Sequence, residues 1–126
     1  MNNLQKQKEK VIAFDFDGVI ATYFGFKGKE HEEKPIDETV KAIKLLKEKG
    51  FKILIHSTRS DGFLKNYCEK YSIPFDYINK NPLEEGDNTR KPPAYLYIDD
   101  RAICFEGQNA EKLVEQVDNF KVYWKK

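Results

Sequence analysis

Short apolar runs alternate with amphipathic stretches along the chain. The first run covers residues 11–16, is rich in strand-forming side chains, and ends at the turn-forming pair Asp17-Gly18. Runs of the same kind predict four more strands, at residues 51–56, 75–78, 94–98 and 103–105. Proline- and glycine-containing segments separate several of these runs, which indicates short strands joined by turns and loops.

Three stretches have apolar residues at helical spacing. The first follows Pro35, has Asp37 as its predicted N-cap, and stops at Gly50. The second begins at Ser60 or Asp61 and the third near Asn109, and Ser, Asp and Asn are all residue types that cap helices. We expect the third helix to turn four apolar side chains inward, those of Leu113, Val114, Val117 and Phe120.

Strands that alternate with helices predict a mainly parallel sheet. The expected fold is therefore α/β, in a three-layer Rossmann-like arrangement with helices on both faces of the sheet. A length of 126 residues fits one domain over residues 1–126. This domain would include a polar N-terminal segment at residues 1–9 and a short flap after the first strand at residues 22–34. Its C-terminal tail at residues 121–126 would be either a solvated end or an added strand.

Composition and charge exclude few partners. The chain is 40% hydrophobic, and its 22 basic residues nearly balance its 21 acidic residues. No overall charge therefore selects nucleic acid, whose binding is possible but not indicated. The first apolar run is broken by Asp15 within five residues, so neither a signal peptide nor a membrane span is expected, and a cytoplasmic location is the default. A homo-oligomer is also possible.

Carboxylates and hydroxyls follow three of the predicted strands. Because the carboxyl ends of parallel strands share one edge of the sheet, these side chains should converge there. Two carboxylates about 4 Å apart repel each other by roughly 4 kcal/mol at an effective dielectric near 20, so the cluster needs a cation. Ligands that are all oxygen atoms suit Mg²⁺. The residues are Asp15, Asp17, Ser57, Thr58, Asp99 and Asp100.

Four segments resemble motifs of the haloacid-dehalogenase-like (HAD) superfamily, in the family's order. Residues 14–20, FDFDGVI, resemble motif I, in which an apolar strand leads into D-x-D-G. Residues 53–59, ILIHSTR, resemble motif II, Lys91-Pro92 resembles motif III, and residues 96–101, LYIDDR, resemble motif IV. The resemblance spans roughly residues 10 to 105 and implies an HAD-like fold. The gaps between the motifs are too short to hold an inserted cap domain.

The resemblance implies a magnesium-dependent phosphatase that acts on a phosphate monoester. Asp15 would attack phosphorus to form an aspartyl-phosphate, and Asp17 would act first as acid and then as base. The family members that cleave halides or phosphonates lack an aspartate at the place of Asp17. Mg²⁺ would be held by Asp15, the Asp17 carbonyl, and Asp99 or Asp100, and the expected substrate is a small phosphorylated metabolite or nucleotide.

The resemblance also assigns residues to the transferred phosphate. Ser57 and Lys91 complete the expected catalytic set, with Thr58 and Lys80 as their respective rivals from the sequence. Phosphate or substrate binding is expected at Gly18, Thr58 and Arg59.

Two functions of other classes share part of this pattern. A phosphate-accepting signalling domain of the receiver type also combines acids, a hydroxyl and a lysine, but its paired acids follow the first strand, whereas here Asp99 and Asp100 come last. A catalytically idle HAD-like binding module would hold the metal without turnover. A nucleic-acid 3′-phosphatase is a variant of the main hypothesis.

Overall fold

The computed structural model describes residues 10–125. Over these residues the chain forms four strands and three helices. In chain order they are β1 (Val11–Asp15), α2 (Asp37–Glu48), β2 (Lys52–His56), α3 (Asp61–Lys70), β3 (Tyr77–Ile78), β4 (Leu96–Ile98) and α4 (Ala110–Asp118). The polar segment predicted at residues 1–9 and the last residue of the predicted tail, Lys126, lie outside the described residues.

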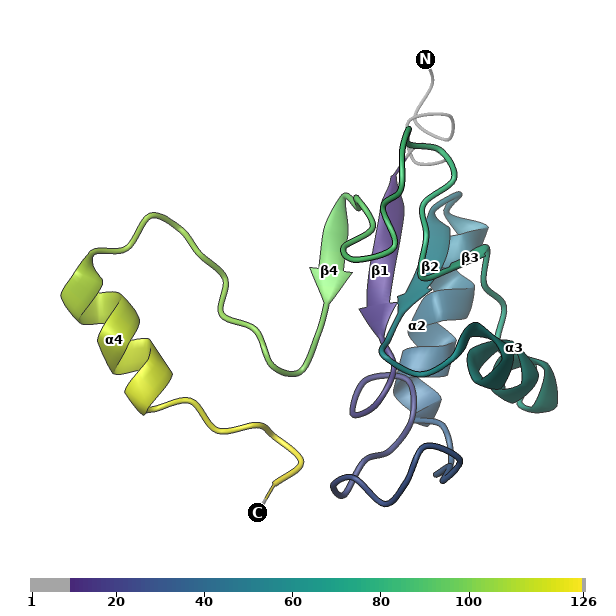
Figure 1. Cartoon of the computed structure of the whole chain (residues 1–126), viewed down its shortest axis with the longest axis horizontal. Coiled ribbons are helices and arrows are strands. Elements are labelled where there is room, and N and C mark those ends of the chain that lie inside the picture. Colours follow the sequence, from purple (N-terminus) through teal and green to yellow (C-terminus); the bar gives the residue numbers. More distant parts are fainter. Residues whose placement is uncertain (1–9, 126) are drawn as a thin grey trace.

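The four strands form one sheet in the order β3-β2-β1-β4, and every neighbouring pair is parallel (Figure 1). This arrangement confirms the predicted α/β fold. The register places Asp15 opposite His56 on β2, and Phe14 opposite Ile98 on β4. Asp99, the first residue after β4, is therefore level with the end of β1.

Helices α2 and α3 cover one face of the sheet. Alternate side chains of β1, Ile12 and Phe14, point toward this face and pack in one cluster with Ile43 of α2 and with Leu64 and Tyr67 of α3. Each of these five side chains is at most 3% exposed. Full burial of one such side chain stabilises the fold by roughly 1.5–3 kcal/mol, so this layer is a main source of stability.

An irregular segment, residues 79–93, packs at the opposite face of the sheet. Val11, Ala13 and Leu54 are buried on that side. The Pro92 carbonyl accepts a hydrogen bond of 2.7 Å from the hydroxyl of Tyr97, whose neighbour on β1 is Ala13. The same segment is held together by Asn81, which is 3% exposed. The Nδ2 of Asn81 donates to the Pro93 carbonyl, and its backbone N–H donates to Asn88.

The helix starts agree with the sequence in two of three cases. The Ser60 hydroxyl accepts a hydrogen bond from the N–H of Phe63, and the Asn109 side chain accepts one from Lys112, so both predicted caps are confirmed. The prediction of Asp37 as an N-cap is wrong, because Ile36 occupies that position without a side-chain cap. The N–H of Ile36 instead donates to the Ile20 carbonyl, which ties the start of α2 to the chain after β1.

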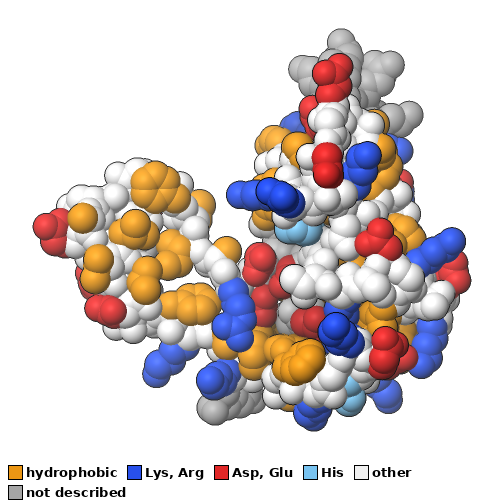
Figure 2. Space-filling model, viewed as in Figure 1, with side chains coloured by type: hydrophobic (Ala, Val, Ile, Leu, Met, Phe, Trp, Pro, Cys, Tyr) orange, Lys and Arg blue, Asp and Glu red, His pale blue; other side chains and the backbone are white. Residues whose placement is uncertain are grey.

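The C-terminal third of the chain differs most from expectation. Within the described residues, 103–105 form no strand and α4 has no buried side chain. Val114 and Val117 are each 59% exposed, so the prediction that they point inward is wrong. The spacing of apolar residues reveals an amphipathic helix but not the surface it packs on. After β4 the chain runs away from the sheet (Figure 1), and hydrophobic side chains gather on the surface of the α4 lobe (Figure 2).

No helix in the described part of the chain is both long and apolar enough to span a bilayer.

The exposure of α4 can be tested with three identical substitutions. Val11→Ala removes two methyl groups from a side chain that is 2% exposed, and we expect it to lower the free energy of unfolding by about 2 kcal/mol. Val114→Ala and Val117→Ala should change it by about 0.5 kcal/mol or less. Urea unfolding followed by circular dichroism measures all three. A loss at Val117 as large as the loss at Val11 would show that the α4 face is buried in solution.

Candidate active site

The site lies at the edge where β1, β2 and β4 end. Asp15 is the last residue of β1, His56 is the last of β2, and Asp99 and Asp100 directly follow β4. Their side chains border a cleft of about 470 Å³. Acidic side chains appear in the hollow between the α4 lobe and the sheet-containing part of the molecule (Figure 2). The other residues that line this cleft are Asp17, Tyr23, Ser57, Thr58, Thr89, Arg90 and Arg101.

Three carboxylates crowd together in this cleft. One oxygen from each of Asp15, Asp99 and Asp100 lies within 4.8 Å of the other two. Burial, a hydrogen bond with Asp100 and the charge of Asp99 raise the pKa of Asp15 from its ordinary 3.8 to about 8. A cation between the three oxygens would offset this repulsion. The donor set is all carboxylate oxygen, so it fits Mg²⁺ and offers no nitrogen or sulfur for zinc.

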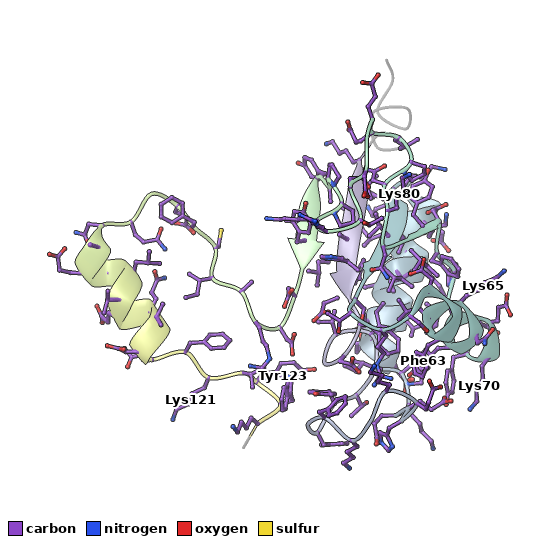
Figure 3. All side chains as sticks on the ribbon, in the orientation of Figure 1. Phe63, Lys65, Lys70, Lys80, Lys121 and Tyr123 are labelled. Atoms are coloured by element: carbon purple, nitrogen blue, oxygen red, sulfur yellow. The ribbon has the colours of Figure 1, made fainter. Side chains whose placement is uncertain are left out.

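Asp17 is held apart from this cluster by Arg59. The guanidinium binds both carboxylate oxygens, with Nε 2.9 Å from Oδ2 and Nη2 3.0 Å from Oδ1. Arg59 is itself fixed, because its guanidinium carbon lies 4.4 Å from the ring centre of Phe63 and its Nη1 donates to the Lys29 carbonyl. Phe63 projects from α3 (Figure 3). Arg59, predicted to bind phosphate, thus positions the carboxylate of Asp17 in this structure.

Gly18 lies at a crowded turn and has φ +84°, a left-handed conformation that favours glycine. A Cβ at this position would lie 2.4 Å from Asp100 Oδ2 and 2.9 Å from Trp124 Nε1. Both distances are shorter than carbon-to-heteroatom contacts allow. A side chain at this position would displace Asp100, so the glycine keeps the space in which the acid cluster forms.

The C-terminal segment also reaches the site, which the sequence did not indicate. The indole N–H of Trp124 donates to Asp100 Oδ2, and the Tyr123 hydroxyl donates to the Gly18 carbonyl. Val122 is 6% exposed. The prediction of a solvated tail is therefore wrong for Val122 and Trp124, whereas Tyr123 is 63% exposed even though its hydroxyl is bound. Figure 3 shows Tyr123 on the segment that returns from α4 toward the sheet. The only signal in the sequence was an aromatic pair set among lysines.

The motif II residues bring two hydroxyl groups to this edge of the sheet. Ser57 and Thr58 line the cleft. The Ser57 Oγ accepts a hydrogen bond from the Arg59 N–H, and its backbone N–H donates to Asn79 Oδ1. Because a hydroxyl can donate as well as accept, the O–H of Ser57 remains able to donate to a bound phosphate.

Lys91, the motif III lysine, does not point into the cleft in this structure. Lys91 Nζ sits 5.1 Å from the ring centre of Tyr97 and does not line the cleft, and neither does its rival Lys80. Arg90 and Thr89, which the sequence did not single out, do line it. Pro92 is fully buried, so the segment is anchored next to these residues.

Asp99 and Asp100 have different second contacts. Asp99 Oδ1 accepts a hydrogen bond of 2.8 Å from the N–H of Arg101, and it is the more exposed of the two. Asp100 is bound by Trp124 and contacts Asp15. Both acids thus have one oxygen constrained by the protein and both contribute to the same cluster.

One solved structure supports the fold, and two others match the chain more weakly. A conserved protein coded by a locus of Bacteroides thetaiotaomicron is similar, with 24% identity over 86% of this chain and 88% of that chain and a TM-score of 0.59. A protein from Vibrio cholerae matches with 18% identity over 86% and 97% of the two chains and a TM-score of 0.49. A chain of a Pnkp1/Rnl/Hen1 complex matches with 14% identity over 92% and 36% and a TM-score of 0.47. No family model and no curated protein matches the chain.

The raised pKa of Asp15 has a consequence for stability in the absence of divalent cations. The folded protein holds a proton on Asp15 up to about pH 8, whereas the unfolded chain loses it near pH 3.8. Between these values the folded state binds more protons, so this group makes stability fall as pH rises, and the effect is constant above about pH 8. Asp15→Asn carries no such charge.

We therefore expect Asp15→Asn to be more stable than the wild type in chelator, with a gap that widens from pH 4 to 8 to a few kcal/mol. Urea unfolding at pH 5, 7 and 9 measures the gap. Added Mg²⁺ should narrow it, because a cation favours the ionised carboxylate. A gap that does not change with pH would show that the pKa of Asp15 is ordinary. Asp118→Asn, on the exposed side of α4, is the matched control.

Proposed function

We propose that this protein is a magnesium-dependent phosphatase of the HAD type that hydrolyses a phosphate monoester through an aspartyl-phosphate on Asp15. The observation that supports this most directly is the separation of two acids only two residues apart. Asp15 lies in a cluster of like charges suited to a cation, while Asp17 is fixed nearby by a guanidinium. One acid is placed to attack and the other to exchange a proton.

The first step transfers the phosphoryl group to the protein. An Asp15 carboxylate oxygen forms a bond to phosphorus, the bond from phosphorus to the ester oxygen breaks, and Asp17 gives its proton to the departing oxygen. Asp15, Asp99 and Asp100 would hold Mg²⁺, which would supply positive charge to offset the charges of the phosphate and of the carboxylates.

The second step restores the protein. Asp17, now ionised, takes a proton from a water molecule, whose oxygen forms a bond to phosphorus while the bond to Asp15 breaks. Inorganic phosphate leaves and both carboxyl groups return to their starting states. The guanidinium of Arg59 can hold the ionised Asp17 carboxylate in place for this second step.

The phosphate oxygens need donors that do not move during the reaction. The Ser57 hydroxyl and the backbone around Thr58 border the cleft and can supply them. A nearby cation adds to this, and motif III names Lys91 for it, while Arg90 is the residue that borders the cleft in this structure. We propose that this segment delivers one of the two cations to the bound phosphate.

The nucleophile is tested with p-nitrophenyl phosphate, with Mg²⁺ and with chelator. We expect the wild type to release phosphate only with Mg²⁺, and Asp15→Asn to lose roughly 10³-fold or more in kcat because covalent transfer needs that carboxylate. Asp118→Asn should behave as the wild type. Turnover that survives chelator, or that survives Asp15→Asn, would refute the mechanism. Mg²⁺ binding seen by calorimetry without turnover of any ester would instead indicate an idle binding module.

Asp17 is tested by the same ester, because nitrophenolate departs without needing a proton. Asp17→Asn should therefore complete the first step but not the second, which needs a base. We expect a rapid burst of about one equivalent of nitrophenolate followed by turnover lowered roughly 10²- to 10⁴-fold. Mass spectrometry of the quenched variant should find phosphate on the peptide that contains Asp15. A uniform slowing without a burst would show that Asp17 is not the base of the second step.

A further inference from the structure

A second cleft adjoins the proposed catalytic cleft, between the flap and the C-terminal segment. Its volume is about 450 Å³, within the range of small-molecule sites. Two of its residues, Tyr23 and Arg101, also line the catalytic cleft, so the two clefts are continuous. The side chains that matter for its chemistry are Tyr23, Phe24, Phe26, Arg101, Trp124 and Lys125.

The flap side of this cleft offers aromatic rings to an incoming molecule. Phe24 is 64% exposed and Phe26 is 75% exposed, so both rings are accessible to a bound molecule. Phe26 and Tyr23 also border a third cleft of about 490 Å³ that contains Asp17. A leaving group that starts at the proton donor Asp17 and extends past the flap therefore meets Tyr23 and Phe26.

The tail side of the cleft is rigid. The rings of Tyr23 and Trp124 meet edge to face, with centres 4.8 Å apart and an angle of 89° between planes. The guanidinium of Arg101 lies 5.1 Å from the centre of the Trp124 ring, and Trp124 is fixed by its hydrogen bond to Asp100. The wall of this cleft is thus attached directly to the acid cluster.

The charged side chains that line this cleft are all positive. Arg101 and Lys125 line it, and no carboxylate does so among the described residues. Guanidinium and ammonium groups donate hydrogen bonds and have no acceptor. The cleft therefore suits a planar ring that carries hydrogen-bond acceptors on its edge. Purine bases have this combination, since guanine presents N7 and O6 to Arg or Lys and any base has a face for stacking.

We propose that the flap and the C-terminal segment bind the base of a nucleoside monophosphate whose phosphate lies at Asp15. This rests on the proposed phosphatase function and specifies its substrate class. Phe26 and Tyr23 stack on or pack against the base, and Arg101 and Lys125 donate to its edge. A free nucleotide and the phosphorylated end of a single strand both offer this combination of a base and a phosphate.

The test compares two esters that differ by the base alone, guanosine 5′-monophosphate and ribose 5-phosphate. Stacking on an aromatic side chain predicts that kcat/KM is roughly tenfold or more higher for the nucleotide than for the sugar phosphate. Guanosine 3′-monophosphate is assayed in the same way, which shows which of the two isomers the site prefers. In Phe26→Ala this ratio should fall toward one, whereas Phe26→Tyr should keep it. The matched control is Phe105→Ala, because Phe105 is 69% exposed and lines none of the three clefts.

Binding is measured separately from turnover with the Asp15→Asn variant. Trp124 is the single tryptophan of the chain, so its fluorescence reports on this cleft. Guanosine monophosphate should change the emission at concentrations at least tenfold below those needed of ribose 5-phosphate. A short single strand phosphorylated at its 3′ or 5′ end, titrated in the same way, shows whether the site takes free nucleotides or strand ends.

The failures of the two proposals are distinguishable. If both esters are hydrolysed equally and Phe26→Ala changes nothing, the phosphatase function stands and the base-binding site is refuted. If neither ester is hydrolysed, the proposed function fails, and the fluorescence titration still decides on the base site. Equal binding of guanosine monophosphate and ribose 5-phosphate in that titration would overturn it.

Discussion

Mutual repulsion among Asp15, Asp99 and Asp100 is the constraint on which the arrangement of the site depends. At effective dielectrics typical of proteins, each close pair of charges opposes folding by a few kcal/mol. The parallel register of β1 and β4 makes this proximity unavoidable, since both strands end at one level. The buried layer between the sheet and the helices α2 and α3 supplies the stability that holds the carboxylates together. A cation bound between these carboxylates would offset their repulsion.

The contrast between Asp15 and Asp17 shows how one short segment places two identical side chains in opposite environments. Phe16 separates them and is 1% exposed, so the backbone between the two acids is anchored in the core. Asp15 remains among like charges, and Asp17 turns to a guanidinium that is itself held against an aromatic ring. The two carboxylates therefore differ in their electrostatic surroundings, with like charges around Asp15 and a cation beside Asp17.

Features that depend on regular spacing of apolar residues were predicted from the sequence, and features that depend on irregular segments or tertiary contacts were missed. The apolar runs identified the strands of the sheet, and because strand ends meet at one edge, the positions of Asp15, Asp99 and Asp100 followed. The sequence could not predict whether Lys91 or Arg90 faces the cleft, because this segment is irregular and its side chains follow no helical or strand spacing. The exposed face of α4 was missed because amphipathic spacing names no partner, and Trp124 was missed because its contact with Asp100 is purely tertiary.

The contact of Tyr123 with Gly18 joins positions 105 residues apart. Contacts between distant parts of a chain form late, because a long loop must close before they stabilise anything. As the chain emerges from the ribosome, β1 with Asp15, and Asp17 just after it, are present well before the segment that closes over them. The acid cluster is therefore assembled in two stages, a sheet edge that forms early and an aromatic closure that forms last. The complete acid cluster, with Trp124 bound to Asp100, then coincides with the completion of folding rather than with the formation of the core.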